Sequence, residues 1–102
     1  MIPLVQSKHP QVVALCRSRG VKRLELFGSA ARADFDDAES DLDFLVDLGD
    51  NPAVSPLDAY FGLKDELETL FNRPVDLVSD GSIRNPFVLA SIQRDRRLLY
   101  PA

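Results

Sequence analysis

Three aspartates carry the most specific chemistry in this 102-residue sequence. Asp41 and Asp43 lie two residues apart in the segment DLDFLVDL, and Asp76 follows in VDLV. Side chains two residues apart on a strand point to the same face, with Cα atoms roughly 6.5–7 Å apart. Carboxylates this close repel each other, and a divalent cation such as Mg²⁺, which takes oxygen ligands, relieves that repulsion. The spacing favours a site for two metal ions, of the kind that supports phosphoryl transfer, if Asp76 points to the same face.

A glycine-serine pair upstream supplies the other half of such a site. Gly28 allows a ligand to approach the backbone closely, and Ser29 begins a short helix whose first amides favour phosphate. Arg32, about one turn further on, is either a cation for the phosphates or a surface arginine. The acidic residues between 34 and 39 are expected to be a solvated loop rather than ligands.

The hydrophobic pattern predicts the elements that position these residues. Period-two alternation predicts strands at 21–27, 41–48 and 73–79. Helical spacing predicts helices at 8–19, 57–72 and 86–97, and a short one at 30–33. We therefore expect an α/β (α+β) fold, a small mixed sheet of about three strands with helices packed on one face, forming a single domain over residues 1–102. We also expect certain apolar side chains in the core, among them Cys16, Phe44, Leu57, Phe61, Phe71 and Phe87.

Composition narrows the class of protein. The net charge of −4 does not indicate binding to nucleic acid. A single cysteine excludes an internal disulfide and makes a cysteine-based zinc site implausible. No apolar stretch approaches the ~20 residues that span a bilayer, and no secretory signal is evident. We expect a soluble cytoplasmic protein without a membrane partner.

The segment GSAARADFDDAESDLDFLV, followed by VDLV, resembles the Gly-Ser…Asp-x-Asp signature of the DNA polymerase β-like nucleotidyltransferase superfamily. The small size makes the chain most similar to the minimal nucleotidyltransferase (MNT) family. The resemblance covers about residues 21–79 and departs at Ala33, where many relatives have glycine.

What the resemblance implies is a nucleotidyltransferase fold and a mechanism. ATP binds with Mg²⁺, with two ions expected, a hydroxyl attacks the α-phosphate, and pyrophosphate leaves. It assigns catalysis and metal binding to Asp41, Asp43 and Asp76, and nucleotide binding to Gly28, Ser29 and Arg32.

The resemblance also implies a partner. Similar proteins are antitoxins that add AMP to a tyrosine of a HEPN-type toxin. The few residues beyond the core likewise suggest that another protein supplies the acceptor. Two alternatives remain open: an antitoxin that neutralises the toxin by binding alone, and a transferase acting on a small molecule, resembling those that inactivate aminoglycosides.

Overall fold

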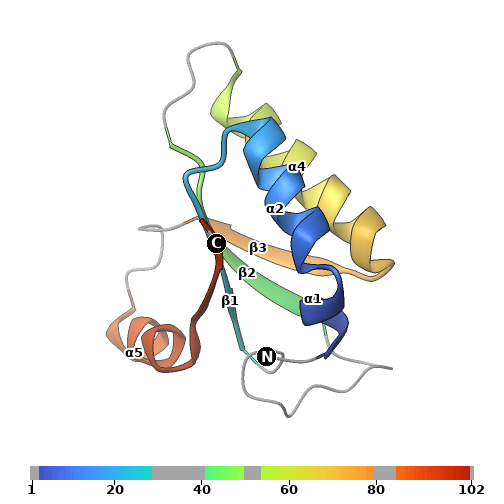
Figure 1. Cartoon of the computed structure of the whole chain (residues 1–102). Helices are drawn as coiled ribbons and strands as arrows, with labels where there is room; N and C mark the ends of the chain where they lie inside the picture. Colours follow the sequence, from blue (N-terminus) through green and yellow to red (C-terminus); the bar gives the residue numbers. More distant parts are fainter. Residues whose placement is uncertain (1–2, 29–40, 50–53, 80–84, 102) are drawn as a thin grey trace.

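The computed structural model describes residues 3–28, 41–49, 54–79 and 85–101 (Figure 1). The elements in chain order are α1 (Pro3–Ser7), α2 (His9–Arg19), β1 (Arg23–Phe27), β2 (Leu42–Asp47), α4 (Pro56–Phe71), β3 (Val75–Ser79), α5 (Pro86–Asp95) and β4 (Arg97–Tyr100). The three predicted strands and three longer helices are confirmed. The predicted short helix at 30–33 lies outside the described residues. Helix α1 and strand β4 were not predicted.

The strands form one mixed sheet in the order β3-β2-β1-β4. Strand β1 is antiparallel to β2 and β4, whereas β2 and β3 are parallel. Strand β4 follows α5 and pairs with β1 at the edge of the sheet. It forms because Leu99 is fully buried and because its carbonyl oxygen lies 2.7 Å from Nε2 of His9, at the start of α2.

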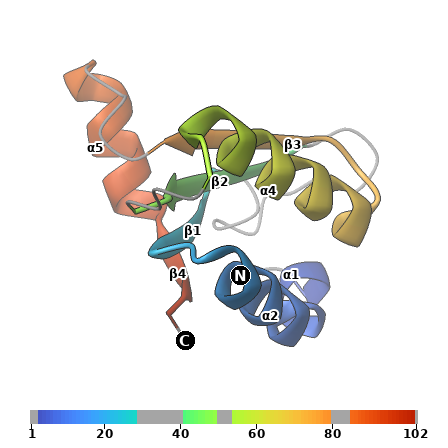
Figure 2. The same ribbon diagram turned by 90° about the horizontal axis from the view of Figure 1, so that it is seen from above.

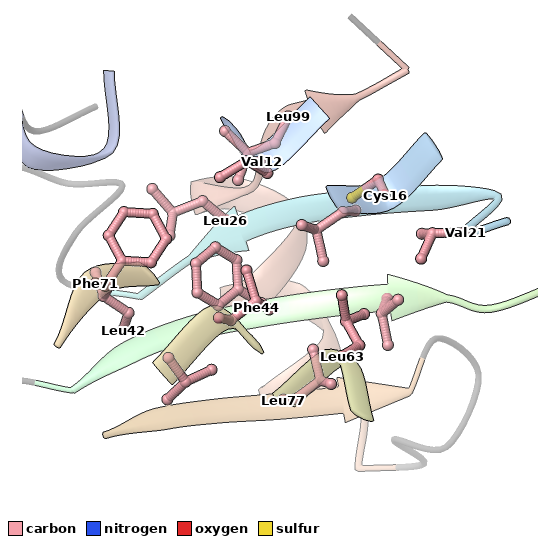
Figure 3. Close-up of a cluster of buried hydrophobic side chains, with 14 of the residues drawn as sticks. Val12, Cys16, Val21, Leu26, Leu42, Phe44, Leu63, Phe71, Leu77 and Leu99 are labelled. Atoms are coloured by element: carbon pink, nitrogen blue, oxygen red, sulfur yellow. The ribbon is translucent and has the colours of Figure 1, made fainter. Parts of the chain in front are cut away.

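Helices α1, α2 and α4 lie on one side of the sheet (Figures 1 and 2). The alternation in β2 sends Leu42, Phe44 and Val46 into the core beneath them. Figure 3 shows this core, in which the Phe44 and Phe71 rings lie 6.0 Å apart. Cys16 is fully buried there, as predicted. The predicted fold class is therefore confirmed, with one strand more than expected.

Capping residues define both ends of helix α4. Oγ of Ser55 accepts the backbone N–H of Asp58 at 3.1 Å, which satisfies a donor that the helix leaves free. Asn72 ends the helix in the left-handed conformation, with φ of 53°. The chain can then turn directly into β3, which brings Asp76 back along the sheet.

Three predicted core residues are exposed. Leu57 and Phe61 are 65% and 50% exposed, and Phe87 is 86% exposed. The buried row of α4 consists of Leu63, Leu67 and Phe71, which follow one another at four-residue spacing, and Phe71 is buried as predicted. Leu57 and Phe61 form a neighbouring row that this packing leaves outside.

The expectation that the helices pack on one face holds for α1, α2 and α4 but is wrong for α5, which lies on the opposite side of the sheet (Figures 1 and 2). Leu45 and Ile92 are buried although they do not belong to the main core. The sheet therefore has a second, smaller covered area on the face that carries Asp43. No helix within the described ranges is long and apolar enough to cross a membrane.

Candidate active site

Asp43 and Asp76 lie side by side on neighbouring strands. Strands β2 and β3 are parallel, and the two aspartates are partners in their register. Partner residues in adjacent strands are roughly 4.8 Å apart and project to the same face. Asp43 is half-buried and Asp76 is exposed. The condition set from the sequence, that Asp76 points to the same face as Asp43, is therefore met.

Gly28 touches the carboxylate of Asp43. Phe27, the last residue of β1, is the register partner of Asp43, and Gly28 follows with φ of 76°. A Cβ at position 28 would lie 2.3 Å from Oδ2 and 3.2 Å from Cγ of Asp43. A side chain at position 28 fits only if this carboxylate moves, so the glycine of the Gly-Ser pair and the aspartate belong to one site.

Asp41 stands beside this pair without joining the sheet. It is exposed and immediately precedes β2, whose first backbone N–H, from Leu42, donates to the carbonyl oxygen of Pro74 at 3.4 Å. This bond holds Asp41 near the start of β3. Ser29 and Arg32, the other predicted nucleotide-binding residues, lie outside the described residues.

The donor set fits Mg²⁺. Within the part of the chain that the structure describes, no three histidine, cysteine, aspartate or glutamate side chains gather closely enough to hold a metal ion alone. Mg²⁺ does not require such a cage, since it is commonly held by one or two carboxylates, substrate phosphates and water. The Asp43–Asp76 pair offers hard oxygen donors of that number on an accessible face.

A buried carboxylate that the sequence reasoning missed lies one row further along the same face. Glu25, the register partner of Leu45, is only 3% exposed. The guanidinium of Arg96 donates to both of its oxygens, and Nε of Arg23 lies 2.7 Å from Oε1. This cluster joins the end of α5 to β1. An available signal was the charged residue between Leu24 and Leu26, because a charge there needs a partner if both faces are covered.

Other polar candidates have structural roles. Oδ1 of Asp47 accepts the backbone N–H of Gly49 at 2.9 Å, and Oδ2 lies 3.9 Å from Nζ of Lys22. Burial raises the pKa of the Cys16 thiol to about 12, so this thiol is not a nucleophile. A groove of about 960 Å³ is lined by Arg17, Gly49 and other residues, but none of the predicted site residues that the structure describes lines it.

Residues 11–99 match a family model described as "Nucleotidyltransferase domain". The chain is 40% identical over 75 residues to the protein MJ1379 of Methanocaldococcus jannaschii, an alignment that covers 74% of this chain and 73% of that protein. That relative is named as a protein adenylyltransferase, an activity that is inferred for it.

Solved structures share the fold. One solved structure, whose protein is described by inference as a minimal nucleotidyltransferase, is 30% identical to this chain. Its TM-score is 0.72, over 94% of this chain and 95% of that chain. A second match is to a complex of a tri-AMPylated HEPN toxin with an MNT antitoxin from Shewanella oneidensis. There the identity is 20% and the TM-score 0.65, over 95% of this chain and 72% of that one, which shows a common fold.

Proposed function

Since the chain belongs to the nucleotidyltransferase domain family and, within it, to the minimal nucleotidyltransferases, we propose that it is a Mg²⁺-dependent antitoxin that transfers AMP from ATP to a tyrosine hydroxyl of a HEPN-type toxin. One observation carries the chemical part of this proposal. Asp43 lies in register with Asp76, and its carboxylate lies against Gly28. Carboxylates and a glycine that permits close approach are thus combined on one accessible face.

Asp41, Asp43 and Asp76 are the proposed ligands of two Mg²⁺ ions, and Gly28, Ser29 and Arg32 are the proposed contacts of the triphosphate. When bound, Mg²⁺ neutralises phosphate charge and makes an approaching hydroxyl more acidic. Asp43 is the carboxylate with the most restricted position, because Gly28 packs against it. Restricted ligands favour transfer, since the reacting groups must be held close to their attack geometry.

The proposed reaction forms one bond and breaks one. The oxygen of the acceptor hydroxyl attacks the α-phosphorus of ATP, and the bond from that phosphorus to the oxygen bridging to the β-phosphorus breaks. Pyrophosphate leaves with the electron pair of that bond. The hydroxyl proton passes to a carboxylate oxygen of Asp76, and from there to water. Asp76 suits this role because it is the exposed member of the pair, which an incoming acceptor can reach.

The proposed identity of the acceptor rests on similarity to known proteins. The inferred activity of MJ1379 supports a protein acceptor and an adenylyl group. The fold shared with a complex of an MNT antitoxin and a tri-AMPylated HEPN toxin supports a HEPN-type partner. The proposed acceptor group is a tyrosine hydroxyl, which peptide mass spectrometry of the labelled partner would identify.

The decisive experiment follows the label from ATP. The chain is incubated with Mg²⁺, ATP labelled at the α-phosphate, and the HEPN-type protein encoded beside it. We expect label on that protein, at a tyrosine identified by peptide mass spectrometry. Asp43→Asn should reduce the rate about 100-fold or more, because it removes the charge that binds metal while keeping the shape. Asp47→Asn is the matched control, since Asp47 lies on the same face of the same strand and should leave the rate unchanged. No label on the partner, with a folded chain, would refute the proposal.

A double variant distinguishes neutralisation by catalysis from neutralisation by binding alone. Asp41→Asn combined with Asp43→Asn should abolish both transfer and neutralisation of the toxin in cells. Neutralisation that survives this change would favour an antitoxin that works by binding. Turnover of a purified small acceptor without a protein partner would favour a small-molecule transferase.

A further inference from the structure

The outer face of α4 carries an exposed apolar patch with an acidic rim. Leu57 and Phe61 are 65% and 50% exposed, and they are neighbours on the helix surface at four-residue spacing. Asp58 and Asp65, three residues before and four residues after Phe61, border them and are exposed. Neither aspartate forms an ion pair with any other described residue, whereas Lys64, three residues after Phe61, lies 3.5 Å from Glu68, so the unpaired charges beside the patch are acidic. Large exposed apolar side chains with a polar rim are typical of a protein interface.

This α4 patch, defined as Leu57, Asp58, Phe61 and Asp65, lies close to the strand that carries Asp76. The ring of Phe61 packs edge-to-face on Tyr60, with centroids 5.1 Å apart. The Tyr60 hydroxyl donates to the carbonyl oxygen of the residue after Asp76. Figure 1 shows α4 alongside β3, which is an edge strand of the sheet. A partner bound to the patch is therefore near the β3 edge of the sheet, and the Asp43–Asp76 face lies on the other side of that edge.

The neighbouring edge is not prepared for an added strand. Tyr60 occupies the carbonyl oxygen of Leu77, and Oε2 of Glu68 accepts the backbone N–H of Val75 at 3.1 Å. A strand that paired with β3 would have to displace both contacts. The occupant therefore binds through side chains. The two acidic residues of the rim repel phosphate and attract lysine or arginine, so nucleic acid is disfavoured and a basic protein surface is favoured.

We propose that the α4 patch is the surface on which the acceptor protein docks, through an apolar side chain flanked by basic residues. This rests on the proposed function, because it names the surface that brings the acceptor to the active site. Docking outside the site gives a small transferase the means to select one protein while the chemistry stays at Asp43 and Asp76. The rim supplies charge-dependent association, and Phe61 is the residue expected to contribute most to affinity.

The test measures association without nucleotide. Isothermal titration of the chain with the HEPN-type protein encoded beside it should give a Kd that rises about tenfold or more in Phe61→Ser. Phe87→Ser is the matched control, because Phe87 is a still more exposed phenylalanine on α5, and its Kd should equal that of the wild type. Asp65→Asn should weaken association at low salt and reduce its dependence on salt. In the transfer assay, Phe61→Ser should raise KM for the partner and leave KM for ATP unchanged.

The outcomes separate this inference from the proposed function. An equal Kd for the wild type and Phe61→Ser overturns the docking surface, whatever the transfer assay shows. A wild-type chain that binds the partner through the patch but transfers no AMP overturns the proposed function alone. If Phe61→Ser instead abolishes self-association in sedimentation and leaves the partner Kd unchanged, the patch belongs to a second copy of the chain and the inference is wrong.

Discussion

Gly28→Ala should reduce transfer far more than it reduces stability. Gly28 has φ of 76°, a conformation that costs an L-residue about 1–2 kcal/mol. In addition, the new Cβ would lie 2.3 Å from Oδ2 of Asp43, whereas ordinary contact begins at 3.4 Å. The carboxylate must therefore move by about 1 Å, and a displacement of that size can cost about 100-fold in rate. We expect a rate loss of about 100-fold together with a drop in melting temperature of about 4–8 °C for each kcal/mol.

Gly20→Ala is the matched control, because it separates backbone strain from the clash. Gly20 has φ of 67°, so alanine there meets a similar conformational cost. Nothing lies within 4 Å of a Cβ at that position. Its melting temperature should fall by a similar amount while transfer stays at the wild-type rate.

Two measurements read the comparison. Thermal unfolding followed by circular dichroism gives the loss of stability, and transfer of labelled AMP gives the rate. Titration with a non-hydrolysable ATP analogue and Mg²⁺ adds a readout that does not depend on an acceptor, and binding should weaken only in Gly28→Ala. If Gly28→Ala and Gly20→Ala transferred AMP at the same rate, the contact between Gly28 and Asp43 would not matter for the site.

Three further predictions concern stability. Arg96→Met should lower the free energy of unfolding by about 3 kcal/mol in urea titration, because it leaves the buried Glu25 with Arg23 as its remaining basic contact; adding Glu25→Leu should recover most of that loss, and no recovery would contradict the explanation. Asp76→Asn should stabilise the metal-free chain by up to about 1 kcal/mol, since it removes repulsion with the carboxylate beside it, and a lower melting temperature would contradict this. The Cys16 thiol should resist a disulfide reagent at pH 8 until the chain unfolds, because burial raises its pKa from 9.0 to about 12. The stability that this pKa difference supplies is complete below pH 9 and is lost as the pH rises towards 12. Cys16→Ala should lack this contribution to the loss of stability.

Strand periodicity predicted the central part of the site. In β2 the buried Leu42, Phe44 and Val46 alternate with Asp43, so the face of the aspartate followed from the pattern alone. The similar alternation in VDLV placed Asp76 on a strand. The register between the two strands did not follow from either pattern. The end of α4 was predicted near Asn72, but the register depends on how α4 packs on the sheet and where the chain re-enters it after Asn72, and that is a property of tertiary packing.

The sequence could not show which apolar residues cover which surface. Leu57 and Phe61 have the spacing of a buried helical row, yet α4 packs through Leu63 and Leu67 and leaves them outside. A helix with more apolar residues than one face can hold gives no local signal of which row will be buried. Leu99 was likewise ambiguous, because a short apolar segment becomes a strand only where an edge is available to pair with.

The extent of the exposed site follows from how α5 is held. Asp43 and the buried Leu45 follow each other on the same face of β2, so this face changes from accessible to covered within two residues. The cover ends there because α5 is anchored through Arg96 to Glu25, the register partner of Leu45. An anchor one row closer to the start of β2 would shift the covered area towards Asp43. The buried ion pair thus limits how far the second covered area extends, and the Asp43–Asp76 row stays accessible, as the proposed binding of a nucleotide and a protein acceptor requires.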